Sequence, residues 1–101
     1  MEIQNTITGY SHELLISGRV DGEGANRLEE EILKAIKGGA QSIYVNLNGA
    51  TFLCSAGLRV LLQYWRQMKN NQRSLLATRP SPEVDAVLAT SGFREMIVEK
   101  V

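Results

Sequence analysis

The stretch that decides the fold reads Asn46-Leu47-Asn48-Gly49-Ala50-Thr51-Phe52-Leu53-Cys54-Ser55-Ala56-Gly57-Leu58. A short apolar run typical of a strand, residues 42–47, leads into it, and the pair Asn48-Gly49 is a strong turn signal. We therefore expect a strand, then an apolar loop over residues 50–54, and then a helix that starts at Ala56. Ser55 stands at the junction between this loop and this helix.

The position of Ser55 is compatible with two roles. The first turn of a helix carries backbone N–H groups without an intrahelical partner and a partly positive charge, so a phosphate is well tolerated there. Adding a phosphate changes the local charge by roughly −1.5 to −2, which suits a binding switch. Serine is also a favoured N-cap residue, so Ser55 would equally serve as a purely structural cap. The sequence leaves both roles open.

Upstream of this stretch, the pattern predicts a hairpin, a loop and a helix. Strands are expected over residues 2–8 and 14–17, joined by a turn over residues 9–12. A glycine-rich loop, residues 18–24, then leads into a helix over residues 25–37. Gly38-Gly39 supplies the left-handed stop that helices often use.

Downstream, the helix from Ala56 to about Asn70 is the clearest element, because it carries an apolar face with helical spacing. That face consists of Leu58, Leu61, Leu62, Trp65 and Met68. A strand over residues 74–78 follows, and then a helix capped by Ser81 with Pro82 at its first position and Gly92 at its end. Val84, Val87 and Leu88 should form the buried face of that helix, and residues 96–98 an edge strand.

Strands that alternate with helices after an initial hairpin predict an α/β fold. The expected architecture is a single domain with a mixed, mainly parallel sheet and helices packed against it. The length of 101 residues is enough for one core. Eleven basic residues balance eleven acidic ones, which gives no electrostatic reason to expect nucleic acid or an anionic membrane as partner.

The cysteine content and the N-terminus favour a cytoplasmic protein. Cys54 is the single cysteine, so an internal disulfide is excluded and a reducing compartment is favoured. The sequence begins without the basic and apolar regions of a signal peptide, and no window approaches the ~20 apolar residues of a membrane span. We expect no membrane insertion.

Few residues offer catalytic or metal-binding chemistry. The single histidine, His12, falls in the expected hairpin turn and is interpreted as a surface residue, and one histidine with one cysteine cannot form a usual zinc site. No P-loop is present. Asp21 either caps the first helix or lines a site beside Ser55. We therefore expect a non-enzymatic binding protein without cofactor, although a reactive thiol at Cys54 is a third reading.

Three segments resemble the STAS family, the domain of bacterial anti-sigma factor antagonists. The family's early strand is similar to Leu14-Leu15-Ile16-Ser17-Gly18-Arg19-Val20-Asp21, and its signature is similar to residues 46–58. Its closing helix and Ser-Gly-Phe/Leu turn are similar to residues 81–84 and 90–93. Since the segments follow in the family's order, the resemblance implies one STAS domain over residues 1–101.

The resemblance also implies a function, partner switching. In such antagonists the serine at the position of Ser55 is phosphorylated by an anti-sigma factor that acts as a serine kinase. The unmodified domain binds the anti-sigma factor, phosphorylation blocks that binding, and a phosphatase restores it. The partner-binding surface implied here comprises Asp21, Gly22, Glu23, Phe52, Leu53, Cys54, Ala56, Gly57 and Arg59.

Two positions depart from the family's signature and keep an alternative open. Cys54 occupies the place of an aspartate, and a thiol lacks the charge and acceptor strength of a carboxylate. Arg59, one helical turn after Ser55, would pair with a phosphate at Ser55 or simply be solvated. The alternative function is an unphosphorylated STAS interaction module of a transporter or signalling assembly.

Overall fold

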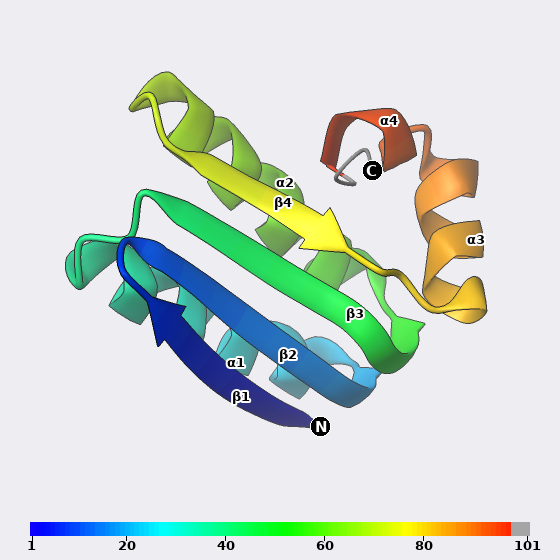
Figure 1. Ribbon diagram of the computed structural model, residues 1–101. Coiled ribbons are helices and arrows are strands. Elements are labelled where there is room, and N and C mark those ends of the chain that lie inside the picture. The colour runs from blue at the N-terminus through cyan, green and yellow to red at the C-terminus, as the bar shows by residue number, and fades with distance from the viewer. Residues whose placement is uncertain (98–101) are drawn as a thin grey trace.

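The computed structural model describes residues 1–97 and consists of a four-stranded sheet with helices (Figure 1). The elements, in chain order, are β1 (Glu2–Thr8), β2 (Ser11–Val20), α1 (Gly22–Lys37), β3 (Ser42–Leu53), α2 (Ser55–Asn70), β4 (Ser74–Thr78), α3 (Pro82–Ser91) and α4 (Arg94–Ile97). The strand order is β1-β2-β3-β4. β1 and β2 pair antiparallel, whereas β2–β3 and β3–β4 pair parallel. The predicted mixed, mainly parallel sheet is confirmed.

The helices cover one face of the sheet. α1 and α2 lie behind it in Figure 1, α3 and α4 flank the end of β4, and the face toward the viewer is open. Strand alternation explains the asymmetry: Leu14 and Ile16 of β2 are fully buried toward the helices, whereas Glu13, Leu15 and Ser17 are exposed. α1 and α2 complete the core with apolar side chains at helical spacing, among them Leu28 and Leu61.

Tyr64 joins the two main helices in a way that the apolar pattern does not reveal. Its ring is buried in α2, and its hydroxyl donates a hydrogen bond of 2.8 Å to Oε2 of Glu29 on α1. Burial, together with the hydrogen bond to the Glu29 carboxylate and its negative charge, raises the pKa of Tyr64 to about 12. The neutral phenol is therefore the form that the folded protein holds.

The titration of Tyr64 should destabilise the fold at high pH. Its pKa is raised from 10.0 to about 12 on folding, so the stabilisation is complete below pH 10.0 and is lost as the pH rises to about 12. Urea unfolding at a series of pH values should show this loss in the native sequence. Tyr64→Phe should lack that part of the pH dependence. An identical alkaline loss in the variant would show that another group is responsible.

Several predicted boundaries of β2, β3 and α1 are wrong, and α2 starts at Ser55, one residue before the predicted start. The expected loop at residues 50–54 belongs mostly to β3, which continues through Asn48-Gly49 to Leu53. The expected glycine-rich loop contributes its first residues to β2, which is longer than predicted at both ends, and α1 begins at Gly22. The pairing of β2 with β3 contains two register shifts. Such shifts cannot be recognised from the sequence of one strand alone.

His12 is not a surface turn residue. The turn of the hairpin is Gly9-Tyr10, and His12 lies in β2, only 6% exposed, opposite Ile43. Strand alternation places it on the helix-covered face with Leu14. Its Nδ1 has no hydrogen-bond partner among the described residues.

The C-terminal prediction is wrong where the structure describes it. Residues 96 and 97 belong to α4 instead of an edge strand, and residue 98 lies outside the described residues. Gly92, with φ 81°, ends α3, and the N–H of Ile97 then bonds to the Phe93 carbonyl at 3.1 Å, so Ile97 reaches the core by a helical turn. In α3 the cap Ser81 and buried Val84 are confirmed. Val87 is 36% exposed, because the helix buries only one narrow face.

Candidate functional site: the start of α2

The site lies where β2 and β3 end side by side. Val20 and Leu53 are register partners at the carboxyl ends of the two strands. The N–H of Cys54 donates to the Val20 carbonyl at 2.9 Å, which holds the first residue after β3 against the end of β2. Two helices therefore start from this edge of the sheet: α1 after Asp21 and α2 after Cys54 (Figure 1).

Ser55 is the first residue of α2 and is exposed to solvent. The N-cap residue is Cys54, whose carbonyl accepts the first helical bond from Leu58 at 3.1 Å, and whose side chain makes no cap bond. The interpretation of Ser55 as a structural N-cap is therefore wrong. The N–H groups of Ser55, Ala56 and Gly57 have no acceptor within the helix, as helical geometry requires. An accessible hydroxyl thus stands beside an uncapped, partly positive helix end.

Gly57 lets this helix end sit close to the strands. A Cβ atom at Gly57 would lie 2.7 Å from Cδ1 of Leu53 and 2.9 Å from Cγ1 of Val20. Real Cβ atoms do not come so close to other heavy atoms. The absence of a side chain at Gly57 therefore allows the first turn of α2 to rest on the two strand ends, and this contact positions Ser55.

Asp21 caps the neighbouring helix. Its Oδ1 accepts a hydrogen bond of 2.8 Å from the N–H of Gly24, so the predicted capping role is confirmed. Asp21 is exposed, as are Gly22 and Glu23 in the first turn of α1. Because Asp21 follows Val20, to which Cys54 is bonded, the start of α1 borders the start of α2. Asp21 therefore combines a structural role with a place beside the Ser55 segment.

Arg19, within the glycine-rich segment of residues 18–24, makes a contact with Phe52 that the sequence did not predict. It is exposed on β2, and its guanidinium carbon lies 4.2 Å from the centroid of the Phe52 ring, a cation–π contact. Arg19 and Phe52 are register partners across a parallel pair. A motif read along one chain segment cannot show this pairing.

The predicted partner-binding residues divide into accessible and buried ones. Gly22, Glu23 and Arg59 are exposed with Asp21, while Phe52, Cys54 and Ala56 are half-buried. Leu53 is 3% exposed and Gly57 is buried, so both act beneath the surface. The accessible residues carry both signs of charge: Asp21 and Glu23 are acidic, and Arg19 and Arg59 are basic.

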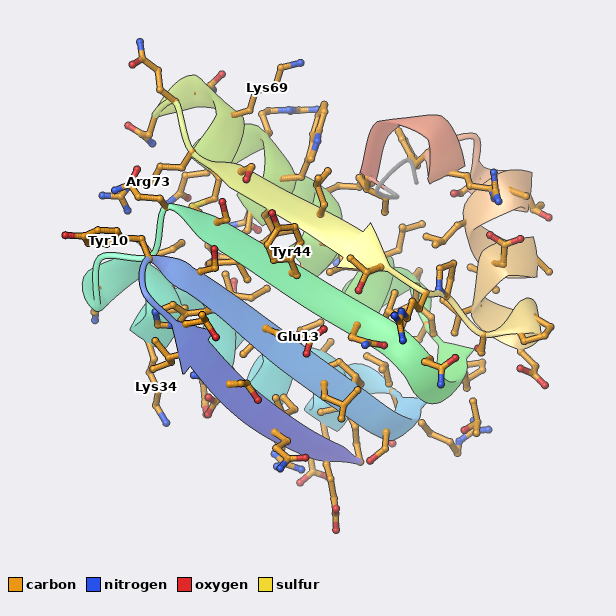
Figure 2. The ribbon with its side chains drawn as sticks, viewed as in Figure 1. Tyr10, Glu13, Lys34, Tyr44, Lys69 and Arg73 are labelled. Carbon is orange, nitrogen blue, oxygen red and sulfur yellow. The ribbon has the colours of Figure 1, made fainter. Side chains whose placement is uncertain are left out.

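A second hollow lies away from this site. It has a volume of ≈ 490 Å³ and is lined by Glu13, Tyr44, Asn46, Thr78 and Arg79. Figure 2 shows Glu13 and Tyr44 on the open face of the sheet. Asn46 is buried there, donates to Glu13 at 3.3 Å and accepts from the N–H of Asn48 at 3.0 Å. The buried Oγ1 of Thr78, which also lines the hollow, has no hydrogen-bond partner among the described residues. Ser55 is not among the residues that line it.

Within residues 1–97, no group of three or more His, Cys, Asp or Glu side chains is gathered closely enough to hold a metal ion. Among the same residues, no helix has the length and apolar character that a membrane span requires.

A family model described as "Mlab, STAS domain" matches residues 3–99. The chain belongs to the STAS family. It is 31% identical over 78 residues to the putative anti-sigma factor antagonist BtrV of Bordetella bronchiseptica, covering 77% of this chain and 67% of that protein.

Two solved structures share the fold of this STAS domain. The anti-sigma factor antagonist SpoIIAA in its unphosphorylated form has a TM-score of 0.84 at 22% identity, over 99% of this chain and 89% of the other. The Bacillus cell fate determinant SpoIIAA in the phosphorylated form has a TM-score of 0.77 at 20% identity, over 99% and 92%. At these identities the likeness concerns the fold.

The uncapped start of α2 gives a stability prediction for the STAS domain. Cys54→Asp should add the missing cap and raise the free energy of unfolding by about 1 kcal/mol, because a carboxylate at this position accepts first-turn N–H groups and opposes the helix dipole. Cys54→Ala, which cannot cap, is the matched control and should lack this gain. Urea unfolding measures both. Equal stability of the two variants would show that the first-turn N–H groups are already satisfied.

Proposed function

We propose that this STAS domain is an anti-sigma factor antagonist that works by partner switching. In its unmodified form it binds an anti-sigma factor with serine kinase activity. Phosphorylation of Ser55 by that partner releases it, and a serine phosphatase restores binding. The domain itself is a binding protein and not an enzyme, and the expected cytoplasmic location goes with this role.

The observation that carries the proposal is the exposed hydroxyl of Ser55 at the uncapped start of α2. A kinase can reach it without unfolding the helix. The phosphate product would face first-turn N–H groups and the helix dipole, and Arg59 lies one turn further on. The modified domain should therefore keep its fold, and the change should act on docking.

The docking surface proposed here surrounds Ser55. It comprises Asp21, Gly22 and Glu23 from α1, Phe52 from β3, and Cys54, Ala56 and Arg59 around the start of α2. Leu53 and Gly57 support this surface from below, since both are buried. A dianionic group at its centre would impose desolvation and like-charge costs on a partner fitted to a neutral hydroxyl.

The relatives support this function by their names. BtrV is described as a putative anti-sigma factor antagonist, and SpoIIAA as one with phosphorylated and unphosphorylated forms. A second candidate function, an unphosphorylated STAS interaction module, is favoured by one observation: the N-cap side chain beside Ser55 is a thiol without a cap bond. If a carboxylate at this place helps a kinase to orient the hydroxyl, Cys54 would slow the reaction.

The experiment that separates the two functions is a phosphorylation assay. The domain is incubated with ATP and an anti-sigma factor of the serine-kinase type from the same organism, and the modified site is mapped by mass spectrometry. The proposal predicts one phosphate, at Ser55, and none on Ser55→Ala. No phosphate from a kinase that modifies its other substrates, or a phosphate elsewhere, would contradict the switch and favour the static module.

A further inference from the structure

β1 is an edge strand, and none of the described residues, 1–97, pairs with its outer side. It is the first strand in the order of the sheet, and Figure 1 shows no element beyond it. Six of its seven residues are exposed. Protected edges usually carry a lysine, a proline or a bulge, and β1 has none of these in its sequence Glu-Ile-Gln-Asn-Thr-Ile-Thr. Its free backbone groups are thus available to another strand.

The hairpin geometry tells which backbone groups point outward. β1 and β2 are joined by the two residues Gly9-Tyr10, so Thr8 and Ser11, which flank this turn, form a hydrogen-bonded pair. Hydrogen-bonded and non-hydrogen-bonded pairs alternate along an antiparallel ladder. The N–H and C=O groups of Ile3, Asn5 and Ile7 therefore point away from β2.

The same three residues place their side chains on the helix side of the sheet. Ile3 is opposite Ile16 and Asn5 is opposite Leu14, and both of these partners are buried beneath the helices. α1 does not reach across β1 completely: Ile3 packs against the core, whereas Ile7 is 61% exposed. A strip of uncharged side chains with an exposed isoleucine thus borders the free edge.

We propose that this edge binds β1 of a second copy of the chain, antiparallel and around a two-fold axis at Asn5. In this register Asn5 faces Asn5, and Ile3 of each copy faces Ile7 of the other. All three outward residues of one strand then meet outward residues of the second, so three hydrogen-bonded pairs form. Residues of β1 other than Glu2 are uncharged, and Glu2 falls opposite Thr8, so no like charges oppose each other.

The flanking helix is compatible with this pairing. The side of α1 nearest β1 carries Arg27, whose Nη1 donates to the Met1 carbonyl at 2.5 Å, and the ion pair of Lys34 with Glu31 at 3.2 Å. Figure 2 shows Lys34 beyond β1 near the Tyr10 end of the strand. A two-fold axis at Asn5 would bring Arg27 of one copy toward the end of α1 that carries the Lys34–Glu31 ion pair in the other.

A second copy fits this edge better than an unrelated partner because the pattern is self-complementary. The pairing of Ile3 with Ile7 arises only when the same sequence runs in the opposite direction. The contact area of one seven-residue strand is at the small end of the range for specific interfaces, so the dimer should depend on concentration.

Sedimentation velocity from about 10 μM to about 1 mM tests the proposal. The mean mass should rise with concentration from 11.2 kDa toward twice that value. A purely monomeric protein at about 1 mM would overturn it. Ile7→Lys should weaken the dimer at least about tenfold, because it places a charge where an isoleucine would be buried. Ser17→Lys, which adds the same charge on β2 away from the edge, is the control and should dimerise normally.

A second pair of variants tests the register. In a Cys54→Ser background, Asn5→Cys should form a disulfide-linked dimer under mild oxidation, because residues in a hydrogen-bonded pair have Cα atoms about 5.5 Å apart. Thr6→Cys, opposite Gln4 in this register, should cross-link far less. Circular dichroism verifies that each variant is folded. A dimer that Ile7→Lys leaves unchanged, or cross-linking at residue 6 in preference to residue 5, would show that another surface is used.

Discussion

Ser55→Asp is expected to weaken binding to the anti-sigma factor by about 100-fold, which corresponds to about 2.7 kcal/mol. The side chain is exposed at the first position of α2, in the middle of the proposed docking surface. A carboxylate there must be desolvated on docking and meets whatever acidic groups the partner offers, whereas the helix end that carries it is compatible with negative charge. Isothermal titration calorimetry with the purified partner measures the loss.

Ser55→Ala is the matched control for this prediction. The substitution removes the hydroxyl without adding charge. The affinity of this variant for the anti-sigma factor should be within a few-fold of that of the unphosphorylated native domain. Thermal unfolding should show that neither substitution disrupts the domain, since the side chain makes no cap bond. Equal affinities of the two variants for the anti-sigma factor would contradict the phosphorylation switch and favour a static interaction module.

Gly57→Val is expected to lower the free energy of unfolding by about 1–3 kcal/mol, the usual cost of overpacking. Even a Cβ atom at Gly57 would lie within 3 Å of Leu53 and Val20, both buried at the strand ends. Either these two buried side chains have to repack, or the first turn of α2 has to move away from the sheet. Because this turn carries Ser55, binding to the anti-sigma factor should weaken together with stability.

The control for Gly57→Val is Arg59→Val, in the same helix but on its exposed side. It should change stability by no more than about 0.5 kcal/mol, because a single exposed side chain contributes little. Urea unfolding compares the two variants. If Gly57→Val were as stable as the native domain, the close contact between α2 and the strand ends would not be what positions Ser55.

Local signals predicted those elements whose boundaries depend on their own residues. The strand over residues 2–8 and the strand over residues 74–78 have the boundaries expected from their patterns. The start of α3 is also as predicted, because the Ser81 hydroxyl accepts from Val84 and Pro82 suits the first helical position. In each case the information lies within a few neighbouring residues.

β3 was not predictable in this way, because its length depends on a neighbouring strand. Asn48-Gly49 is a turn signal in isolation. In the structure the Asn46 side chain accepts from the N–H of Asn48, and a Cβ at Gly49 would lie 3.0 Å from the Ile16 carbonyl. The glycine thus serves a close approach between β2 and β3, and the strand continues. The buried place of His12 likewise depends on the parallel pairing.

Sequence patterns predicted the residues at the centre of the site, but not the contacts between strands at its edge. Ser55 and Asp21 follow from helix-start signals, although the structure moves the cap of α2 to Cys54. The contact of Arg19 with Phe52 was not predicted, because it joins two strands that are far apart in the sequence. Leu53 and Gly57 lie in the matching motif and are buried, so motif membership alone did not separate contacting from supporting residues.

The most direct test of the central claim is the affinity of the phosphorylated domain itself. Domain carrying one phosphate at Ser55, verified by mass spectrometry, is titrated into the anti-sigma factor beside the unmodified domain. We expect tight binding of the unmodified form, a loss of about 100-fold in affinity on phosphorylation, and recovery after phosphatase treatment. Equal affinity of the two forms would contradict the account.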